Sequence, residues 1–462
     1  MILSVLSVLS VFSVFSVFSV MKVQSACQPR SNLRTPYMRH HGPRPCTGVV
    51  RWRRTMYNIL MKRTIVLSEY QPRLFPADAL CEATAQRLWQ HLARLVSVDF
   101  PSPKTAGQWQ LTAQGWAGIV PVAPDLTLVL RPKVAIAHLL QMVDLVYDLQ
   151  SFQLLRGTVP ALTVPEFYEH LAILLAQRTV DRCRHGLHRP YQRHEAATAF
   201  VRGRLHIVEL LRRPVPMTLP CIYHEQAVDV VDNRILRWTL ERILQSDLGR
   251  NVAPSRMRST VHDALRSLRS VVALQPFTAV DCRNRRYTRL NADYAQLHAL
   301  CAFFLEASGP SHFPGDTESV PFVVNMAQLY EQFVAAWLQR YLPAIWQLQI
   351  QERHALSDQL HFAIDLVLYD RAAGKPVAVL DTKYKVPAAG PDTADVAQVV
   401  AYAAAKGATE AYLIYPQPLH EPLDATVGGV HVRTVAFALD GDLHEAGVQL
   451  LKSLAVHISG VR

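Results

Sequence analysis

Hydrophobic and polar residues follow two different periods along the chain, beginning near residue 61. In several long stretches the apolar residues recur every three or four positions, which places them along one face of an α-helix. In shorter stretches they recur at every second position, as in a β-strand. The two periods together predict a chain of mixed α and β structure. The stretches predicted as helices are residues 79–95, 134–149, 165–185, 229–248, 257–272, 291–306 and 323–341.

Other stretches carry the strand pattern. Residues 61–75 (MKRTIVLSEYQPRLF) contain a short β-like run. Residues 118–133 (GIVPVAPDLTLVLRPK) alternate on both sides of a Pro and Asp turn signal, which predicts a hairpin. Residues 361–370 (HFAIDLVLYD) and 376–385 (PVAVLDTKYK) are strand-like and flank a turn-like segment, so they predict a second hairpin.

The N-terminal segment is of a different kind. Its first 20 residues repeat Ser-Val-Leu and then Ser-Val-Phe, and the sequence up to Arg54 is rich in Arg, Pro and His without a period. The repeat is long enough to cross a bilayer, but a serine at every third position argues against a span. We therefore expect residues 1–55 to be a disordered tail or a start-site artefact, with translation beginning near Met56 or Met61.

A length of 462 residues favours two domains plus extra segments, and a hydrophobic content of 50% excludes a mainly disordered chain. The pattern divides into an N-terminal α+β domain, residues 61–285, and a C-terminal α/β domain, residues 286–462. The formal net charge of +11 suits a polyanionic partner such as nucleic acid, although it is also common among proteins without one. Seven scattered cysteines without a CxxC pair indicate reduced thiols in a cytoplasmic protein.

The second predicted hairpin carries unusual charges. In its first strand Phe362, Ile364, Leu366 and Leu368 are expected on one face and Asp365 on the other, among apolar residues. A carboxylate in such a place is costly to bury unless a positive group meets it. The hairpin is therefore a candidate site.

In the second strand Asp381 and Lys383 share a face, and residues two apart on a strand lie roughly 6.5–7 Å apart. Asp365, Asp381 and Lys383 can then meet across the hairpin. Two carboxylates can fix one or two Mg²⁺ ions, which polarise a phosphate and lower the pKa of water, while the lysine stabilises the developing negative charge. The other interpretation is a surface hairpin with a solvated Asp–Lys pair.

The flanking segments supply further candidates. Residues 391–408 predict a helix with an Asp/Thr start and a Gly stop, on which Gln398 and Tyr402 share one face. A strand, EAYLIYP, completes a strand–strand–helix–strand order. Upstream, Glu331 either points at the same site or is an ordinary exposed helix glutamate.

This order of elements resembles the PD-(D/E)xK nuclease superfamily. The run from Asp365 to Pro416, with D-T-K-Y-K, D-V-A-Q-V-V-A-Y-A and L-I-Y-P, looks like the McrC family of restriction subunits. A departure is Ile364, since the family's acid often follows a proline. Further segments similar to that family are LRPK at 130–133, GLHRPY at 186–191, VRGRLH at 201–206 and DVVDNRILRWTL at 229–240.

The resemblance implies the Mg²⁺-dependent endonuclease subunit of a McrBC-like, 5-methylcytosine-specific restriction system acting in phage defence. It implies Asp365, Asp381 and Lys383 as catalytic residues, with Asp365 and Asp381 as metal ligands. By their positions on predicted helices, Gln398 is added as a further catalytic residue and Glu331 as a further metal ligand. The resemblance assigns no role to the remaining candidates, Tyr402, Arg202 and Arg204.

The chain has no phosphate-binding GxxxxGK[ST] loop, because the nearest fragment, AGKP at 373–376, lacks the spacing and the hydroxyl. The resemblance therefore implies a separate McrB-like AAA+ GTPase hexamer that docks to residues 61–285 and selects methylated double-stranded DNA, with no membrane involved.

Two other functions stay open. The chain resembles, at the superfamily level, a stand-alone PD-(D/E)xK nuclease of DNA repair or recombination, which would cut DNA with magnesium but without GTP or a partner. Alternatively it is a non-catalytic adaptor of the GTPase, in which case Asp381→Ala would leave restriction intact.

Overall fold

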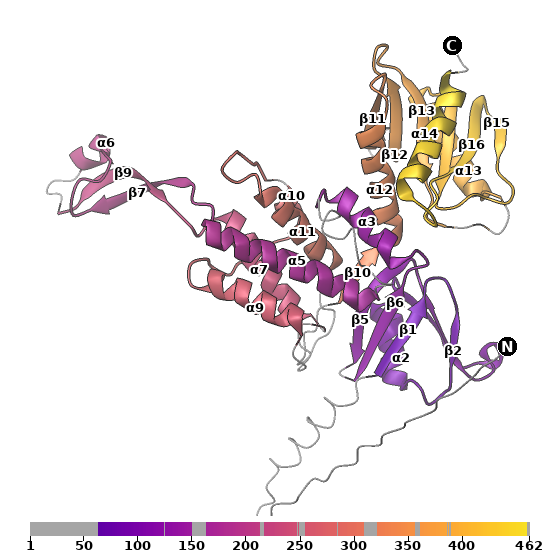
Figure 1. Ribbon diagram of the computed structural model, residues 1–462, viewed down its shortest axis with the longest axis horizontal. Coiled ribbons are helices and arrows are strands. Elements are labelled where there is room, and N and C mark those ends of the chain that lie inside the picture. The colour runs from indigo at the N-terminus through magenta and orange to yellow at the C-terminus, as the bar shows by residue number, and fades with distance from the viewer. Residues whose placement is uncertain are drawn as a thin grey trace, which may run out of the picture. The chain divides into compact units, whose positions relative to one another are not determined.

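The computed structural model shows a chain of mixed α and β structure with several sheets, as the two periods predicted (Figure 1). Within the described ranges no helix is long and apolar enough to cross a membrane. The expectations for residues 1–55, including the Ser-Val repeat, lie outside those ranges. The structure describes residues 63–123, 125–149, 163–212, 217–246, 248, 255–283, 285–308, 321–355, 361–385, 387 and 390–459.

Two small sheets form the N-terminal region around one hydrophobic core that includes Leu88, Leu111 and Leu128. In the larger sheet β1 pairs with β6 in parallel, and the predicted β5–β6 hairpin is present. The larger sheet has the order β1 (Arg63–Ser68), β6 (Leu126–Arg131), β5 (Trp116–Ala123) and β10 (Phe322–Asn325). The smaller has the order β2 (Arg73–Phe75), β4 (Trp109–Ala113) and β3 (Val96–Asp99), with helix α2 (Glu82–His91) nearby.

The stretches with helical periods form helices, because their apolar faces pack together in the largest core of the protein. One prediction was wrong at its start: residues 323–325 belong to strand β10, and the helix begins only at Met326. Asn325 caps it, since its side-chain oxygen accepts from the backbone N–H groups of Ala327 and Gln328. These helices are α3 (Ile136–Val146), α5 (Val164–His185), α7 (Val231–Gln245), α9 (Arg256–Arg269), α11 (Tyr294–Ala307) and α12 (Met326–Tyr341). The short helix α10 (Ala279–Arg283) lies outside the predicted stretches.

A two-stranded ribbon inserted between α5 and α7 was not predicted. Its strands β7 (Tyr191–Thr198) and β9 (Leu219–Gln226) are antiparallel, and they carry β8 (Arg204–Leu205) and the short helix α6 (Ile207–Leu211). Most of β7 is exposed, so no face of it needs to be apolar and the period of two is absent.

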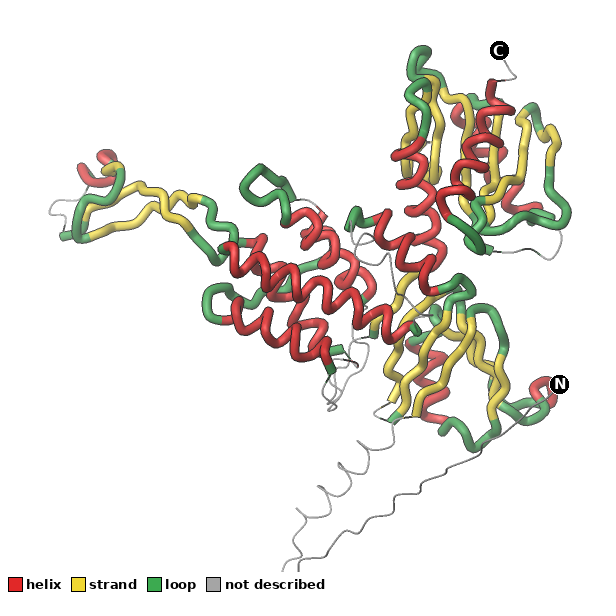
Figure 2. The backbone as a smooth tube through the Cα atoms, in the orientation of Figure 1, coloured by secondary structure: helices red, strands yellow, loops and turns green. Residues whose placement is uncertain are grey.

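The C-terminal sheet has the order β11-β12-β13-β14-β16-β15 (Figure 2). Strands β11, β12 and β13 are antiparallel to one another, whereas β13, β14 and β16 are parallel. The predicted strand–strand–helix–strand order is present. Its elements are β11 (Trp346–Ala355), β12 (His361–Asp370), β13 (Pro376–Thr382), α13 (Thr393–Lys406), β14 (Glu410–Tyr415), β15 (Asp424–Val427), β16 (Val430–Ala436) and α14 (Leu443–Ser459).

Both faces of this sheet are covered, so its strands are buried on two sides. One core includes side chains of α13, and the other includes side chains of α12 and α14. The expected alternation of β12 was therefore wrong in part: Leu366 packs in the second core, but Ile364 packs with Val367 in the first. The change of face occurs at Asp365, and nearby on β11 Gln351 has a left-handed φ of 48°.

The regular structure continues past residue 286, where the sequence pattern placed a domain boundary. Helix α11 packs on α5 and α7, and strand β10 pairs with β5, so elements after this position complete N-terminal ones. Helix α12 follows β10 directly and contacts α3, β11 and β13. Residues 55–462 accordingly form one compact unit.

Candidate functional site

The structure brings the three charged residues of the predicted hairpin together. The register pairs Leu366 of β12 with Leu380 of β13, which makes Asp365 and Asp381 neighbours on adjacent strands. The Lys383 ammonium lies 2.7 Å from Asp381 Oδ2. Two acids and a lysine thus share one site on adjacent strands, as expected from the period of two.

Backbone hydrogen bonds hold this site in place. Lys383 follows the end of β13, but its N–H still donates to the Ile414 carbonyl of β14 at 2.9 Å. Thr382 donates to Asp365 Oδ2 twice, from its backbone N–H at 3.2 Å and from its hydroxyl at 3.3 Å. The pairing of β13 with β14 and β12 therefore fixes the positions of Lys383 and Asp365.

The two carboxylates are electrostatically unfavourable. Asp381 is only 2% exposed, and burial together with the charge of Asp365 raises its pKa to about 6, although Lys383 opposes the shift. Burial also raises the pKa of Asp365, against the Thr382 hydrogen bonds and the Lys383 charge. Additional positive charge at this site would relieve the repulsion.

Helix α13 supplies the polar groups that hold the lysine. Lys383 Nζ donates to Gln398 Oε1 at 2.9 Å, and Gln398 Nε2 donates to the Tyr402 hydroxyl at 2.8 Å. The helix ends at Gly407, which adopts a left-handed conformation with φ 69°, as its predicted Gly stop requires. The ammonium is consequently fixed between a strand carboxylate and a helix amide.

Glu331 of α12 interacts electrostatically with the same site. Burial, followed by the charge of Asp365, raises its pKa. Its Oε1 accepts a hydrogen bond of 3.1 Å from the Gln351 amide. The structure therefore brings Glu331 into the electrostatic field of Asp365, while its hydrogen bond directs it to β11.

Two further residues at this site were not singled out by the sequence pattern. Asp395 of α13 is buried, with Oδ1 3.8 Å from Lys383 Nζ and Oδ2 2.7 Å from Lys385 Nζ. The signal that could have found Asp395 is its spacing of three from Gln398, which places both on one helix face. Lys385 is two residues beyond Lys383 in the same D-T-K-Y-K run.

The donor set fits a hard cation with open positions. Among the described residues no three His, Cys, Asp or Glu side chains form a metal-binding group, so Glu331 is not brought to the aspartates as a third ligand. Two carboxylates do suit Mg²⁺, which keeps several waters and commonly binds proteins through one or two carboxylates plus substrate phosphates. Asp365 and Asp381 are thus able to hold magnesium only together with water or substrate.

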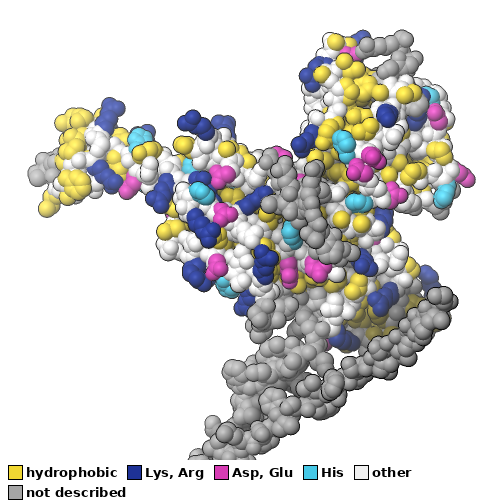
Figure 3. All heavy atoms as spheres, viewed as in Figure 1, with side chains coloured by type: hydrophobic (Ala, Val, Ile, Leu, Met, Phe, Trp, Pro, Cys, Tyr) yellow, Lys and Arg dark blue, Asp and Glu magenta, His cyan; other side chains and the backbone are white. Residues whose placement is uncertain are grey.

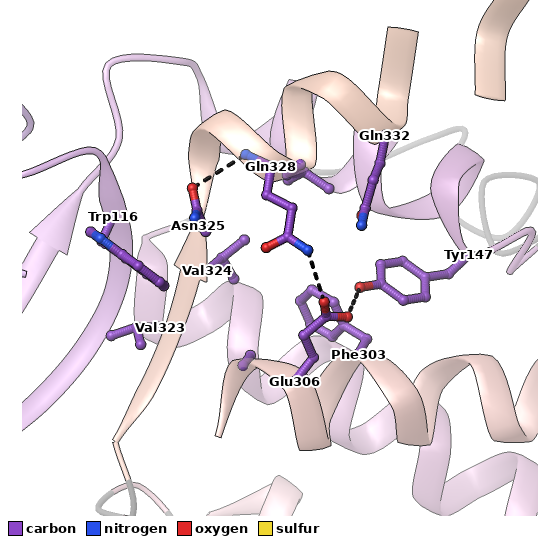
Figure 4. Close-up of a pocket in the computed structure, with 11 residues that line it drawn as sticks. Trp116, Tyr147, Phe303, Glu306, Val323, Val324, Asn325, Gln328 and Gln332 are labelled. Carbon is purple, nitrogen blue, oxygen red and sulfur yellow. Dashed lines mark hydrogen bonds between the residues drawn. The ribbon is translucent and has the colours of Figure 1, made fainter. Parts of the chain in front are cut away.

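Two cavities in the part of the chain that the structure describes lie away from these aspartates. One of about 90 Å³ is lined by residues of β5, α11, β10 and α12 and by Tyr147, which follows α3 (Figure 4). Its carboxylate, Glu306, already accepts from the Tyr147 hydroxyl at 3.0 Å and from the Gln328 amide at 3.2 Å. A larger one, of about 890 Å³, lies along α5 and α9. Neither of these two cavities is lined by Asp365 or Asp381.

Comparisons with known proteins identify a matching family and proteins of similar fold. The family model described as McrBC 5-methylcytosine restriction system component matches residues 111–416. One chain of a refined half-complex from the tetradecameric assembly of Thermococcus gammatolerans McrB AAA+ hexamers with bound McrC is similar in fold, with a TM-score of 0.53. It is 18% identical, and the match covers 85% of this chain and 99% of that chain.

A chain of the cryo-EM structure of the Thermococcus gammatolerans McrBC complex is also similar, with a TM-score of 0.43, 18% identity, and coverage of 61% of this chain and 88% of that chain. No curated protein matches the chain. The family match spans more than half of the sequence, and the chain belongs to the McrBC 5-methylcytosine restriction system component family. The predicted resemblance is confirmed.

Proposed function

We propose that this chain is the Mg²⁺-dependent endonuclease subunit of a McrBC-like, modification-dependent restriction system in the cytoplasm, and that its C-terminal sheet is a PD-(D/E)xK nuclease domain. The observation that carries the proposal is the Lys383 ammonium, held 2.7 Å from Asp381 Oδ2 and 2.9 Å from Gln398 Oε1 beside the half-buried carboxylate of Asp365. Perturbed, mutually repelling acids next to an ordered lysine are typical of catalytic sites.

Each residue has a distinct role in this proposal. Asp365 and Asp381 would hold magnesium, which supplies Lewis-acid polarisation of the phosphate and a lower pKa for water. Lys383 donates hydrogen bonds to the phosphoryl oxygens as negative charge develops on them. Gln398 orients the Lys383 ammonium, and Thr382 orients the Asp365 carboxylate through its two hydrogen bonds. Glu331 adds negative charge near the cation.

The partner in this proposal is an AAA+ GTPase ring, like the McrB hexamers named in the Thermococcus gammatolerans complex. Support comes from the end of the β7–β9 ribbon, where apolar side chains gather at the surface (Figure 3). Clustered exposed apolar side chains commonly mark a protein interface. The exposed residues are Phe200, Val201, Ile207, Val208, Leu211 and Met217.

The base of the ribbon is held firmly. Asn233 of α7 donates from Nδ2 to the carbonyls of His188 and Val228, which flank the two strands, at 2.9 and 2.6 Å. The Tyr294 hydroxyl of α11 donates to Asn233 Oδ1 at 2.5 Å and accepts from the His188 N–H at 3.0 Å. A ribbon anchored in this way can transmit a binding event at its end to the helices.

The distribution of charge along the chain supports DNA binding by parts of the protein other than the nuclease sheet. Residues 1–54 contain eight Lys and Arg and no Asp or Glu, and residues 164–307 contain 21 Arg and 14 acids. Residues 308–462, by contrast, contain 10 Lys and Arg and 16 acids. An acidic nuclease region repels a polyanion, so we expect the helical region and the GTPase to bring methylated DNA to it.

The test is cleavage of methylated and unmethylated plasmid DNA by the full chain, with and without its GTPase, in Mg²⁺ and GTP. Lys383→Ala is expected to lower cleavage by at least about a hundredfold, since it removes the group that meets the developing charge. Lys375→Ala, in the exposed turn between β12 and β13, is the matched control and is expected to cleave normally.

The other outcomes of this experiment would indicate the two alternative functions. Cleavage that depends on Lys383 but needs neither GTP nor partner would indicate the stand-alone repair nuclease. Cleavage by the complex that is unchanged in Lys383→Ala would overturn the proposed active site and leave the adaptor.

A further inference from the structure

The residue after the proposed catalytic lysine connects the nuclease sheet to the N-terminal sheet. Tyr384 is buried, with 5% exposure, and its ring packs 5.8 Å from the ring of Tyr330 on α12. Its hydroxyl donates to Glu69 Oε2 at 3.2 Å. Glu69 follows strand β1 directly, 315 positions earlier in the chain. The contact therefore joins the end of β13 to the end of β1.

Lys133 completes this contact from the end of β6. Its backbone N–H donates to Glu69 Oε2 at 3.1 Å, and its ammonium lies 4.3 Å from the centre of the Tyr384 ring. The same ammonium is 5.4 Å from the centre of the Tyr70 ring. A lysine over the face of an aromatic ring is attracted by the negative charge of that face. Lys133 and Glu69 thus hold Tyr384 from two directions.

Burying the Glu69 carboxylate costs more free energy than a purely structural contact requires. Glu69 is 3% exposed, and its Oε1 is buried without a hydrogen bond to any described residue. Burial raises the pKa of Glu69, while Lys133 and Tyr384 oppose the shift. Burying a carboxylate oxygen without a partner costs free energy, whereas an apolar or amide side chain would pack here at a lower cost. A role beyond packing explains the carboxylate.

That role follows from the position of Tyr384. Residues 381–384 run without interruption from the proposed metal ligand through Lys383 to the held tyrosine. A group misplaced by about 1 Å loses much of its catalytic effect, so whatever fixes this segment also fixes the ammonium. The LRPK segment, to which the site itself assigns no task, ends in Lys133 at this contact.

We propose that Glu69 and Lys133 are positioning residues of the nuclease site: by holding Tyr384 they set the Lys383 ammonium between Asp381 and Gln398. The N-terminal sheets thereby influence the nuclease site through this contact. The inference rests on the proposed function for its catalytic meaning. The geometry of the contact stands independently of that function.

The first test compares two tyrosine variants of the full chain in complex with the GTPase. Tyr384→Phe removes only the hydrogen bond to Glu69 and is expected to lower kcat for cleavage about tenfold, with the KM for DNA and the rate of GTP hydrolysis unchanged. Tyr369→Phe is the matched control, because its hydroxyl also donates to a carboxylate, Glu352, but within the nuclease sheet. Its kcat is expected to stay within about twofold. Equal effects of the two variants would overturn the proposal.

A double-variant cycle tests whether Glu69 acts through Tyr384. Glu69→Ala is expected to lower kcat as Tyr384→Phe does, and the double variant to be no slower than either single variant. Glu69→Gln keeps an acceptor oxygen and is expected to recover most of the loss. Independent, multiplying effects of the two single variants would show that they act by different routes and would contradict the proposal.

A readout without cleavage separates this inference from the proposed function. The rate at which an amine-acylating reagent modifies Lys383 in the chain alone, measured by mass spectrometry against Lys375, reports how the ammonium is held. Tyr384→Phe is expected to raise this rate several-fold, and Tyr369→Phe to leave it unchanged. An unaltered Lys383 rate overturns the positioning role. If the rate rises but Lys383→Ala still cleaves normally, the positioning is correct and the proposed nuclease function is wrong.

Discussion

Two clusters of polar side chains in this protein differ in how far positive charge balances their carboxylates. In the helical region, the Asp232 carboxylate is met by Arg285, whose Nε donates to it at 2.8 Å. His298 pairs through Nε2 with the Asp232 carbonyl at 3.0 Å, and the Asn233 amide is hydrogen-bonded on both sides. This cluster contains its own counter-charge.

The cluster on the C-terminal sheet contains more negative than positive groups. Burial raises the pKa of Asp365, and burial together with the charge of Asp365 raises the pKa values of Asp381 and Glu331. Lys383 is the ammonium in contact with Asp381. A balanced cluster stabilises the fold, whereas an excess of buried negative charge costs stability unless something binds to it. The difference indicates that the first cluster maintains structure and that the second one is kept for function.

The largest expected effect separates activity from stability at Asp381. Asp381→Asn is expected to lower DNA cleavage by at least about a hundredfold, because it removes a proposed metal ligand. In magnesium-free buffer the same change is expected to raise the free energy of unfolding by about 1–3 kcal/mol, because it removes a buried charge repelled by Asp365. Asp440→Asn, an exposed aspartate of the same region, is the control for urea denaturation. A less stable Asp381→Asn would mean that the carboxylate is balanced after all.

The helical cluster is expected to behave in the opposite way. Asp232→Ala leaves the partly buried Arg285 guanidinium without its carboxylate and is expected to lower the free energy of unfolding by about 2–4 kcal/mol. Hydrogen exchange of α7 and α11 should accelerate with it. Asp263→Ala on α9, whose ion pair with Arg266 is exposed, should change stability by less than about 0.5 kcal/mol. Equal effects would remove the contrast between buried and surface pairs.

The smallest expected effect is a change of stability with pH, which has opposite signs for His298 and Asp381. Burial lowers the pKa of His298, which faces Asp232, Arg285 and His188, so its contribution to stability is complete above the unfolded pKa of about 6.5 and is lost as pH falls below it. The raised pKa of Asp381, about 6, acts oppositely: its contribution is present at low pH and is lost as pH rises through about 4 to 6.

Urea denaturation in magnesium-free buffer between pH 5 and 8 would detect both signs. The advantage of Asp381→Asn over the native chain should grow by about 1 kcal/mol as pH rises through this window. The stability that His298→Gln loses relative to the native chain should shrink as pH falls. Parallel profiles for the two variants would contradict the opposite signs.

Local chemistry explains which elements could be predicted. The helices of the core, the β5–β6 hairpin and the capped helix α13 follow from periods of 3.6 and 2 and from residues such as Asp392 and Gly407, since these signals act within a few positions. The convergence of Asp365, Asp381 and Lys383 follows from the same reasoning, because adjacent strands of a hairpin bring such residues together.

Elements without a buried face could not be predicted in this way. The β7–β9 ribbon lacks an apolar stripe because most of β7 is exposed, and β10 was read as helix because Val323 and Val324 continue the apolar pattern of α12. The change of face at Asp365 depends on a local irregularity of the neighbouring strand. The net charge of +11 also concealed an acidic C-terminal region, since a sum does not show where charges lie.

The sequence by itself determined the family, the mixed architecture and the acid–lysine hairpin, because each of these rests on residues close together in the chain. Tertiary structure alone decided that Lys383 is held by Gln398, that Glu331 is directed to Gln351, and that Tyr384 meets Glu69 across 315 positions. The physical reason is that such contacts depend on how separate elements pack, and packing follows from the whole core rather than from any local pattern.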